Sequence, residues 1–165
     1  MGRVITREDA VRRAAELKSA GKTVVFTNGC FDVLHRGHVD LLAAARGLGD
    51  VLVVGLNSDA SVRRLKGPGR PWMDEEDRAA LVAALEAVDF VVVFPEDTPR
   101  ELIEALRPRV LVKGGDYRKE DVVGAERVES DGGRVVIVPL TPGRSSTALR
   151  RRLEPDSSNF TSSGG

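Results

Sequence analysis

Both histidines of the chain lie in one short segment, His35-Arg36-Gly37-His38, which closely follows the apolar run Thr23–Thr27. The run is closed by Asn28-Gly29 and predicts a buried strand, and the residues from His38 to Arg46 predict a helix. An imidazole at a helix N-terminus lies where free N–H groups and the helix dipole favour an anion. Gly37, between the histidines, allows a close approach to the backbone. The segment therefore predicts a phosphate-binding site.

Two other interpretations of the histidines were weighed. A lone histidine is more often a surface residue without a role, but a pair directly after the first strand of an α/β chain favours a site. A metal site would take Asp32 as its third ligand and would still be short of the four ligands that zinc prefers. We therefore expect no metal ligands from the protein. Cys30, in a tight turn, is interpreted as a small buried thiol rather than a nucleophile.

Three further segments could hold phosphate. Lys66-Gly67-Pro68-Gly69-Arg70 has a cation at each end of a glycine-rich loop, although an ordinary exposed turn has the same composition. Lys113-Gly114-Gly115-Asp116 follows a predicted strand, where the glycine pair could serve only as a turn. Ser145-Ser146-Thr147 precedes a predicted helix and offers hydroxyl and N–H groups to an anion, with a plain N-cap as the alternative.

The elements that must position these residues alternate along the chain. Four more runs have nearly continuous apolar character, as a sheet covered on both faces requires: Val51–Leu56, Phe90–Phe94, Val110–Val112 and Val135–Val138. Helices are predicted from Thr6 to Gly21 and from Asp74 onward, and a capping box, Thr98-Pro99-Arg100-Glu101, opens a third that ends at Pro108.

Strands alternating with helices predict βαβ units. The expected fold is a single Rossmann-like, doubly wound α/β domain with a five-stranded parallel sheet over residues 1–153. Residues 154–165 are expected to form a disordered tail. In such sheets the ligand lies beyond the carboxyl ends of the strands, near the point where the strand order reverses. This places the histidine segment and Lys113 on the same edge.

Composition limits the partners. The 165 residues carry 25 Lys and Arg against 25 Asp and Glu, so the formal net charge is zero. A polymeric nucleic acid or an anionic membrane would call for a broad basic face, so we expect neither. The single cysteine is typical of a reducing compartment, and no apolar stretch approaches the length of a membrane span. A cytoplasmic location is expected.

The histidine segment resembles the signature of nucleotidyltransferases with a His-x-Gly-His motif. Further segments narrow the resemblance to the heptose 1-phosphate adenylyltransferases, which also occur fused to a heptose kinase. They are Thr27–Asp32, Asn57–Val62, Gly69–Pro71, Leu111–Tyr117 and Ser145–Thr147. The resemblance covers nearly the whole chain except the tail. Trp72 departs from it, because the family more often has an aliphatic residue there.

The resemblance implies a set of site residues. His35, His38, Lys66 and Lys113 would be catalytic, with the Lys66–Arg70 loop closing over the reacting phosphates. Nucleotide or phosphate binding would fall to Asn28, Gly29, Phe31, Asp32, Gly37, Asn57, Asp59, Arg70, Arg78, Gly115, Asp116, Ser145, Ser146 and Thr147. Arg78 has an alternative as an ion-pair partner of Glu75.

The implied reaction is transfer of AMP from ATP to D-glycero-D-manno-heptose 1-phosphate, which releases pyrophosphate. ATP is a substrate, and Mg²⁺ would be held mainly through its phosphates. The expected partners are these small molecules, a second copy of the chain in a homo-oligomer and a possible separate heptose kinase. Two alternatives stay open: a cytidylyltransferase acting on glycerol 3-phosphate or a similar ester, and a nucleotide-binding module without catalysis.

Overall fold

The computed structural model describes residues 1–140, 142–143 and 148. The strands in this part are β1 (Arg3–Val4), β2 (Val24–Gly29), β3 (Val51–Asn57), β4 (Phe90–Phe94), β5 (Val110–Gly114) and β6 (Arg134–Val138). The helices are α1 (Arg7–Ser19), α2 (Arg36–Arg46), α3 (Asp59–Lys66), α4 (Glu75–Ala83), α5 (Arg100–Leu106) and α6 (Ala125–Ser130), and a 3₁₀ turn, η1 (Lys119–Asp121), precedes α6.

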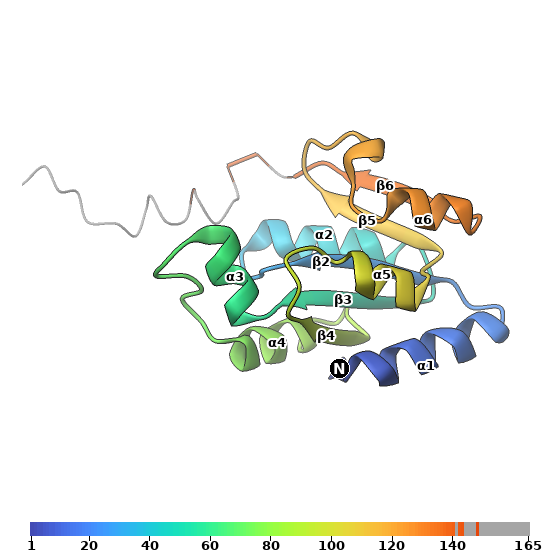
Figure 1. Ribbon diagram of the computed structural model, residues 1–165, viewed down its shortest axis with the longest axis horizontal. Helices are drawn as coiled ribbons and strands as arrows, with labels where there is room; N and C mark the ends of the chain where they lie inside the picture. Colours follow the sequence, from blue (N-terminus) through green and yellow to red (C-terminus); the bar gives the residue numbers. More distant parts are fainter. Residues whose placement is uncertain (141, 144–147, 149–165) are drawn as a thin grey trace, which may run out of the picture.

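The described strands form one parallel sheet in the order β1-β4-β3-β2-β5-β6 (Figure 1). The chain moves outward from β2 through β3 to β4, and then crosses to the other side of β2 to form β5. The strand order therefore reverses between β2 and β5. In an open parallel sheet the crevice for a ligand forms at this point, outside the carboxyl ends of the strands.

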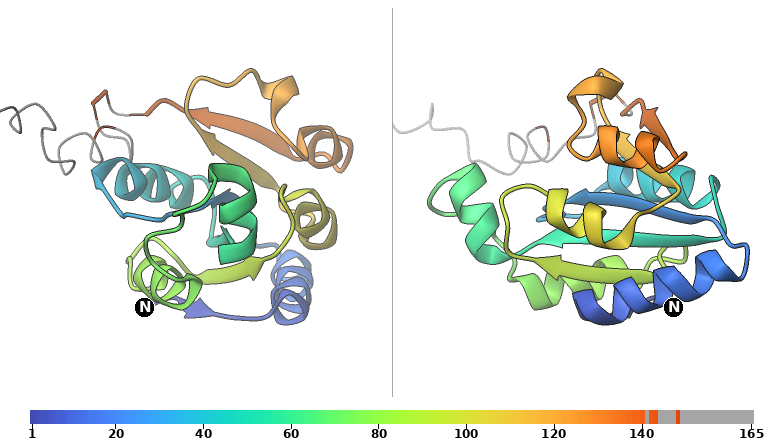
Figure 2. Two further views of the ribbon diagram at one scale, coloured as in Figure 1. Left: turned by 60° about the vertical axis from the view of Figure 1, so that its left-hand side comes forward. Right: turned by 45° about the vertical axis from the view of Figure 1, so that its right-hand side comes forward.

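Helices cover both faces of the sheet, and this explains why the strands are apolar throughout. In the left view of Figure 2, α2 and α4 lie on one side of the sheet and α1, α5 and α6 on the other. Close packing leaves little spare room in the core. A Cβ on Gly55 in β3 would lie 2.8 Å from Cζ of the Phe26 ring, so the glycine makes space for that ring. The predicted doubly wound α/β class is confirmed.

The sheet has six strands in the described part of the chain. The predicted number of five was wrong because it left out the short edge strand β1. Two residues are too few to show a hydrophobic period, so β1 could not be found from its own sequence. Long-range contacts place it instead. Gly2 donates to the carbonyl of Ala83 at 2.9 Å, and Ile5 donates to that of Val91 at 2.9 Å. A Cβ on Gly2 would lie 2.4 Å from the carbonyl oxygen of Val88.

The helix starts follow the predicted caps in two cases and depart from them in two. Thr6 caps α1 and Asp74 caps α4, as expected. The predicted capping box at Thr98 does not form, because Pro99 occupies the N-cap position of α5 and Thr98 lies outside the helix. Helix α2 begins at Arg36, two residues earlier than predicted, because His35 is its cap.

The predicted domain boundary at residue 153, the tail over 154–165 and the hydroxyl cluster Ser145-Ser146-Thr147 lie outside the described residues. Among the helices that are described, none combines the length and the apolar character that a membrane crossing requires.

Candidate active site

A pocket of about 510 Å³ opens at the carboxyl edge of the sheet, where the strand order reverses. The structure brings together half of the predicted site residues in its lining. They are Asn28, Gly29, Phe31, Asp32, His38, Asn57, Lys66, Arg70 and Lys113. The strand topology therefore gathers residues from four separate stretches of the sequence at one place.

The turn that follows β2 shapes the floor of the pocket. Phe31 has a φ of 48°, which is uncommon for a residue with a side chain, and its ring is 4% exposed. The ring lies 5.1 Å from that of His38, and a Cβ on Gly29 would approach it to 3.0 Å. Gly29 thus leaves room for the Phe31 ring, and this ring packs against the ring of His38.

Hydrogen bonds fix the orientation of both imidazoles at the start of α2. The backbone N–H of Gly37 donates to Nδ1 of His35 at 3.1 Å, and the backbone N–H of His35 donates to Nδ1 of His38 at 3.4 Å. The two rings stack with their centroids 3.8 Å apart. Because Nδ1 accepts a hydrogen bond in each ring, the neutral imidazole carries its proton on Nε2. Each histidine therefore offers one Nε2–H donor.

The surroundings keep these histidines neutral. Burial lowers the pKa of His38 to about 4, and the nearby His35 and Lys66 contribute further because a second positive charge would be repelled. Burial also lowers the pKa of His35. The imidazoles of the free protein are thus hydrogen-bond donors without a full charge near neutral pH. An anionic ligand would raise both pKa values by favouring the protonated form.

Three cationic side chains line the pocket, and they come from a helix, a strand and a loop. Lys66 is the last residue of α3, followed by Gly67 with a φ of 90°. Lys113 lies near the end of β5 with Nζ 5.3 Å from the centre of the Tyr117 ring, and burial lowers its pKa. Arg70 lies in the loop between α3 and α4 and is 13% exposed. The cations face a common space, as a polyphosphate site requires.

Asp32 ties the loop after α3 to the turn after β2. Its Oδ1 accepts the backbone N–H groups of Trp72 at 2.8 Å and Met73 at 3.1 Å. Its Oδ2 lies 2.7 Å from Nε of Arg70 as an ion pair, and its side chain is 2% exposed. The guanidinium of Arg70 also lies over the Trp72 ring, 4.6 Å from its centre. Trp72 therefore supports Arg70, which gives a physical role to the departure from the family pattern.

The other described site residues do not line the pocket. His35 stacks on His38, and Gly37 is buried in the first turn of α2. Gly115, with a φ of 118°, donates to the carbonyl of Val138, so it forms a turn beside Asp116. Asp59 and Arg78 bind each other instead of facing the pocket, and the predicted Arg78–Glu75 pair is replaced by this contact.

Sequence reasoning missed part of the lining. It includes Cys30, Leu65, Asp97, Thr98, Pro99, Tyr117, Asp121, Val122 and Val123. Asp97, Thr98 and Pro99 follow the end of β4, so the rule that placed Lys113 at the carboxyl edge could have found them. Asp121 to Val123 lie in an irregular connection with no such signal. Cys30 is half-buried and lines the pocket, so the expectation of a buried thiol was wrong, although desolvation still raises the pKa of the thiol.

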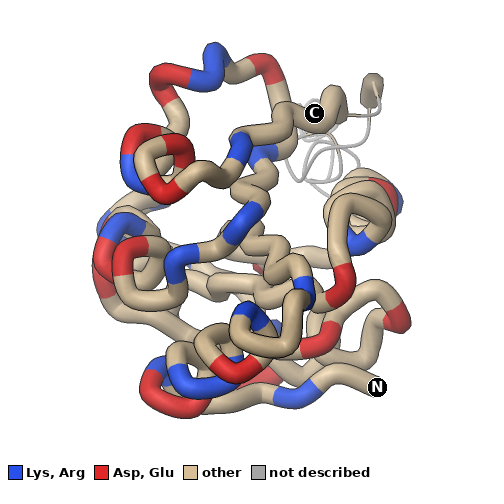
Figure 3. Tube along the Cα trace, turned by 90° about the vertical axis from the view of Figure 1, so that its right-hand side faces the viewer, with Lys and Arg blue, Asp and Glu red and all other residues tan. Residues whose placement is uncertain are grey.

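The opposite edge of the sheet, where the strands begin, also carries charges of both signs. Figure 3 looks onto the edge where the strands begin, and basic and acidic segments are interspersed over it. Several of these charges pair with one another, for example Arg107 with Asp131 at 2.8 Å and Arg46 with Asp89 at 3.2 Å. A net charge of zero is therefore compatible with a pocket in which cations gather.

Oriented imidazoles and cations at the switch point of a parallel sheet suit the binding and transfer of a nucleotide's phosphate groups, as a nucleotidyltransferase requires. The chain belongs to the cytidylyltransferase-like family, whose model matches residues 26–152.

The chain is also similar to part of several bacterial proteins described as bifunctional protein HldE. It is 59% identical to the protein of Syntrophotalea carbinolica over 150 residues, and the aligned region covers 90% of this chain and 31% of the relative. It is 57% identical over 156 residues to that of Mesorhizobium japonicum, covering 94% of this chain and 32% of the relative. The chain therefore spans about a third of the length of these relatives.

Two solved structures share the fold. The lipopolysaccharide core biosynthesis protein from Thermoplasma volcanium has a TM-score of 0.61 and 28% identity, over 73% of this chain and 98% of its own. Pantoate-beta-alanine ligase from Francisella tularensis has a TM-score of 0.58 and 14% identity, over 93% of this chain and 74% of its own. At that identity the second likeness concerns the fold alone.

Proposed function

We propose that the protein transfers AMP from ATP to D-glycero-D-manno-heptose 1-phosphate, giving ADP-heptose and pyrophosphate. The observation that carries the transferase chemistry is the placement of His38, Lys66 and Lys113 around one pocket at the switch point of the sheet. The Leu111–Tyr117 segment, which resembles the heptose enzymes, supports the choice of sugar. The similarity to a lipopolysaccharide core biosynthesis protein is consistent with that choice.

In the proposed reaction a phosphate oxygen of the sugar 1-phosphate attacks the α-phosphorus of ATP. A bond forms between them, the bond to the bridging oxygen of the β-phosphate breaks, and pyrophosphate leaves with that oxygen. A phosphate monoester is already a competent nucleophile, so no covalent intermediate with the protein is required. The residues contribute by holding the two phosphates in line and by stabilising charge as it develops.

Five polar side chains of the pocket have a part in this proposal. The Nε2–H of His38 donates to a phosphate oxygen, and Lys66 and Lys113 neutralise the triphosphate. Burial has already removed part of the water from Lys113, which strengthens its interaction with an anion. The Asp32 carboxylate is bound to the backbone of the loop after α3 and to Arg70, and in this proposal it holds Arg70 near the reacting groups.

Mg²⁺ is part of the proposal as a companion of the triphosphate. No three metal-ligating side chains converge among the described residues, so the phosphate oxygens would supply the main ligands. The ion would neutralise charge on the phosphates. The possible separate heptose kinase, the homo-oligomer and the cytoplasmic location stay predictions.

A pyrophosphate-release assay tests the proposal. The protein is incubated with Mg²⁺, each nucleoside triphosphate in turn, and either anomer of heptose 1-phosphate or glycerol 3-phosphate. Release with ATP and heptose 1-phosphate is the expected result. Release only with CTP and glycerol 3-phosphate would favour the cytidylyltransferase alternative. Binding of ATP without release from any acceptor would favour the non-catalytic module.

A further inference from the structure

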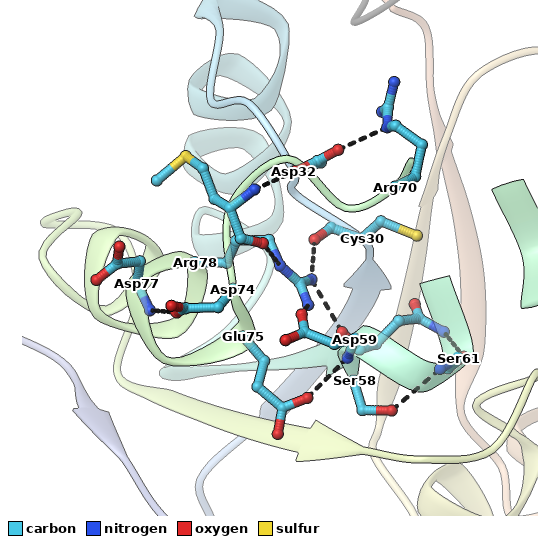
Figure 4. A network of polar contacts seen from close by, with 12 residues as sticks. Cys30, Asp32, Ser58, Asp59, Ser61, Arg70, Asp74, Glu75, Asp77 and Arg78 are labelled. Atoms are coloured by element: carbon cyan, nitrogen blue, oxygen red, sulfur yellow. Dashed lines mark hydrogen bonds and ion pairs between the residues drawn. The ribbon is translucent and has the colours of Figure 1, made fainter. Parts of the chain in front are cut away.

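Arg78 in α4 is a buried cation that touches neither solvent nor the pocket. It is 1% exposed, and its guanidinium is surrounded by acceptors (Figure 4). Nε donates to the carbonyl of Met73 at 3.0 Å, and Nη1 donates to those of Cys30 at 2.6 Å and Asn57 at 2.9 Å. Nη2 donates to the carboxylate of Asp59 at 2.7 Å. A guanidinium has five N–H groups in a rigid fork, which suits several acceptors at once.

The acceptors belong to different segments that build the pocket. Cys30 lies in the turn that leads from β2 to the histidines, and Asn57 ends β3. Met73 closes the loop that carries Arg70, and Asp59 begins α3, the helix that ends at Lys66. A single side chain from behind the pocket thus connects the segment of the histidines with both segments of the loop cations.

Both backbone polar groups of Met73 are hydrogen-bonded to charged side chains. Its N–H donates to Oδ1 of Asp32, and its carbonyl accepts from Nε of Arg78. The next N–H toward the pocket, that of Trp72, also donates to Asp32. The position of the loop relative to the turn after β2 therefore depends on both charged side chains.

Burying a guanidinium is costly, and its carboxylate partner Asp59 is 28% exposed, so the pair is only partly shielded from water. An apolar side chain in α4 would avoid that cost, but it would leave the carbonyls of Cys30, Asn57 and Met73 without their donor. What Arg78 supplies is therefore a connection between the segments that carry these acceptors. We propose that Arg78 is a positioning residue, whose guanidinium holds the turn of the histidines and the loop of Lys66 and Arg70 in the geometry that phosphate transfer requires.

Two substitutions at Arg78 test this. Arg78→Lys keeps the buried charge but cannot bridge the same set of acceptors, and Arg78→Met removes the charge at similar length. The control is Arg107→Met, which breaks the ion pair with Asp131 at the opposite edge of the sheet. Folding is checked by circular dichroism and by a cooperative thermal transition.

The first readout needs no substrate. Trp72 is the single tryptophan of the chain, it is 48% exposed, and it precedes Met73. In folded Arg78 variants we expect stronger quenching of its fluorescence by acrylamide and an emission shift to longer wavelength, because the loop is released. The Arg107→Met protein should keep the wild-type fluorescence.

The second readout is the kinetics of pyrophosphate release, and it rests on the proposed function. A displaced catalytic group lowers kcat and kcat/KM together, on the order of a hundredfold for a shift of about 1 Å. Wild-type fluorescence and kcat in a folded Arg78→Lys protein would overturn the inference. Failure of Arg78→Lys to fold would overturn it as well, because Arg78 would then act on the fold as a whole. If the wild-type protein releases no pyrophosphate, the proposed function fails and the fluorescence alone decides.

Discussion

His38 is expected to stay neutral in the free protein until the pH falls to about 4, well below the ordinary value of 6.5. Its Nδ1 accepts a backbone N–H, and burial beside His35 and Lys66 opposes a charge on the ring. The lowering of the pKa from 6.5 to about 4 corresponds to roughly 3–4 kcal/mol between the two protonation states before any screening. Since the ring is only partly buried, about 1–3 kcal/mol is expected after screening by solvent.

The sign of the effect on stability follows from proton binding. Well above pH 6.5 the His38 ring is unprotonated in both the folded and the unfolded protein, and the stabilisation is fully present. As the pH falls from 6.5 toward 4, the unfolded chain takes up a proton that the folded protein refuses, so the free energy of unfolding decreases. The His38→Asn variant, which has no titratable ring, should lose correspondingly less stability over this range in urea unfolding.

Nuclear magnetic resonance of the histidine rings measures the effect directly, because the chain has only two histidines. Nitrogen-15 labelling is expected to show the Nε2–H tautomer for both, and the His38→Asn variant assigns the signals. Adding inorganic triphosphate should raise the pKa of His38. A pKa of 6.5 or higher in the free protein, or an Nδ1–H tautomer, would refute the reasoning.

Three further outcomes follow from the structure. Lys113→Met should lower kcat on the order of a hundredfold in the pyrophosphate assay while the thermal transition stays cooperative, and an unchanged kcat would exclude Lys113 from the reaction. Asp32→Asn should lower the free energy of unfolding by about 3 kcal/mol, because it removes the charged partner of buried Arg70. It should also increase the quenching of Trp72 fluorescence, and a stability in urea equal to that of the wild type would contradict this role of Asp32. Gly55→Ala should cost about 1–3 kcal/mol by crowding the Phe26 ring, and a neutral effect would mean that the core has spare room.

The long strands could be predicted because each is a continuous apolar run, and burial on both faces demands that pattern. All five predicted runs are strands, from β2 to β6. The edge strand β1 could not be predicted, since two residues have no period and its place depends on contacts with the distant residues Ala83 and Val91. The start of α5 was misplaced for a local reason, because Pro99 is compatible with either the cap or the first turn.

The candidate site was predictable where residue type and strand position coincide. His38 follows β2 and Lys113 lies near the end of β5, and the topology brings both to the pocket at the carboxyl edge. Arg78 was expected to reach the nucleotide phosphates or to pair with Glu75. Its actual partners are three backbone carbonyls and the carboxylate of Asp59, and no residue type signals the carbonyl contacts. The direction of a side chain from a helix is decided by packing, which a sequence period describes only coarsely.

The most direct test of the central claim is pyrophosphate release by the purified protein with Mg²⁺, ATP and D-glycero-β-D-manno-heptose 1-phosphate, with identification of the nucleotide product by mass spectrometry. The proposed function predicts ADP-heptose in amounts equal to the pyrophosphate released, and a loss of both on the order of a hundredfold or more in His38→Ala. Full activity of His38→Ala, or no ADP-heptose from the wild-type protein, would contradict it.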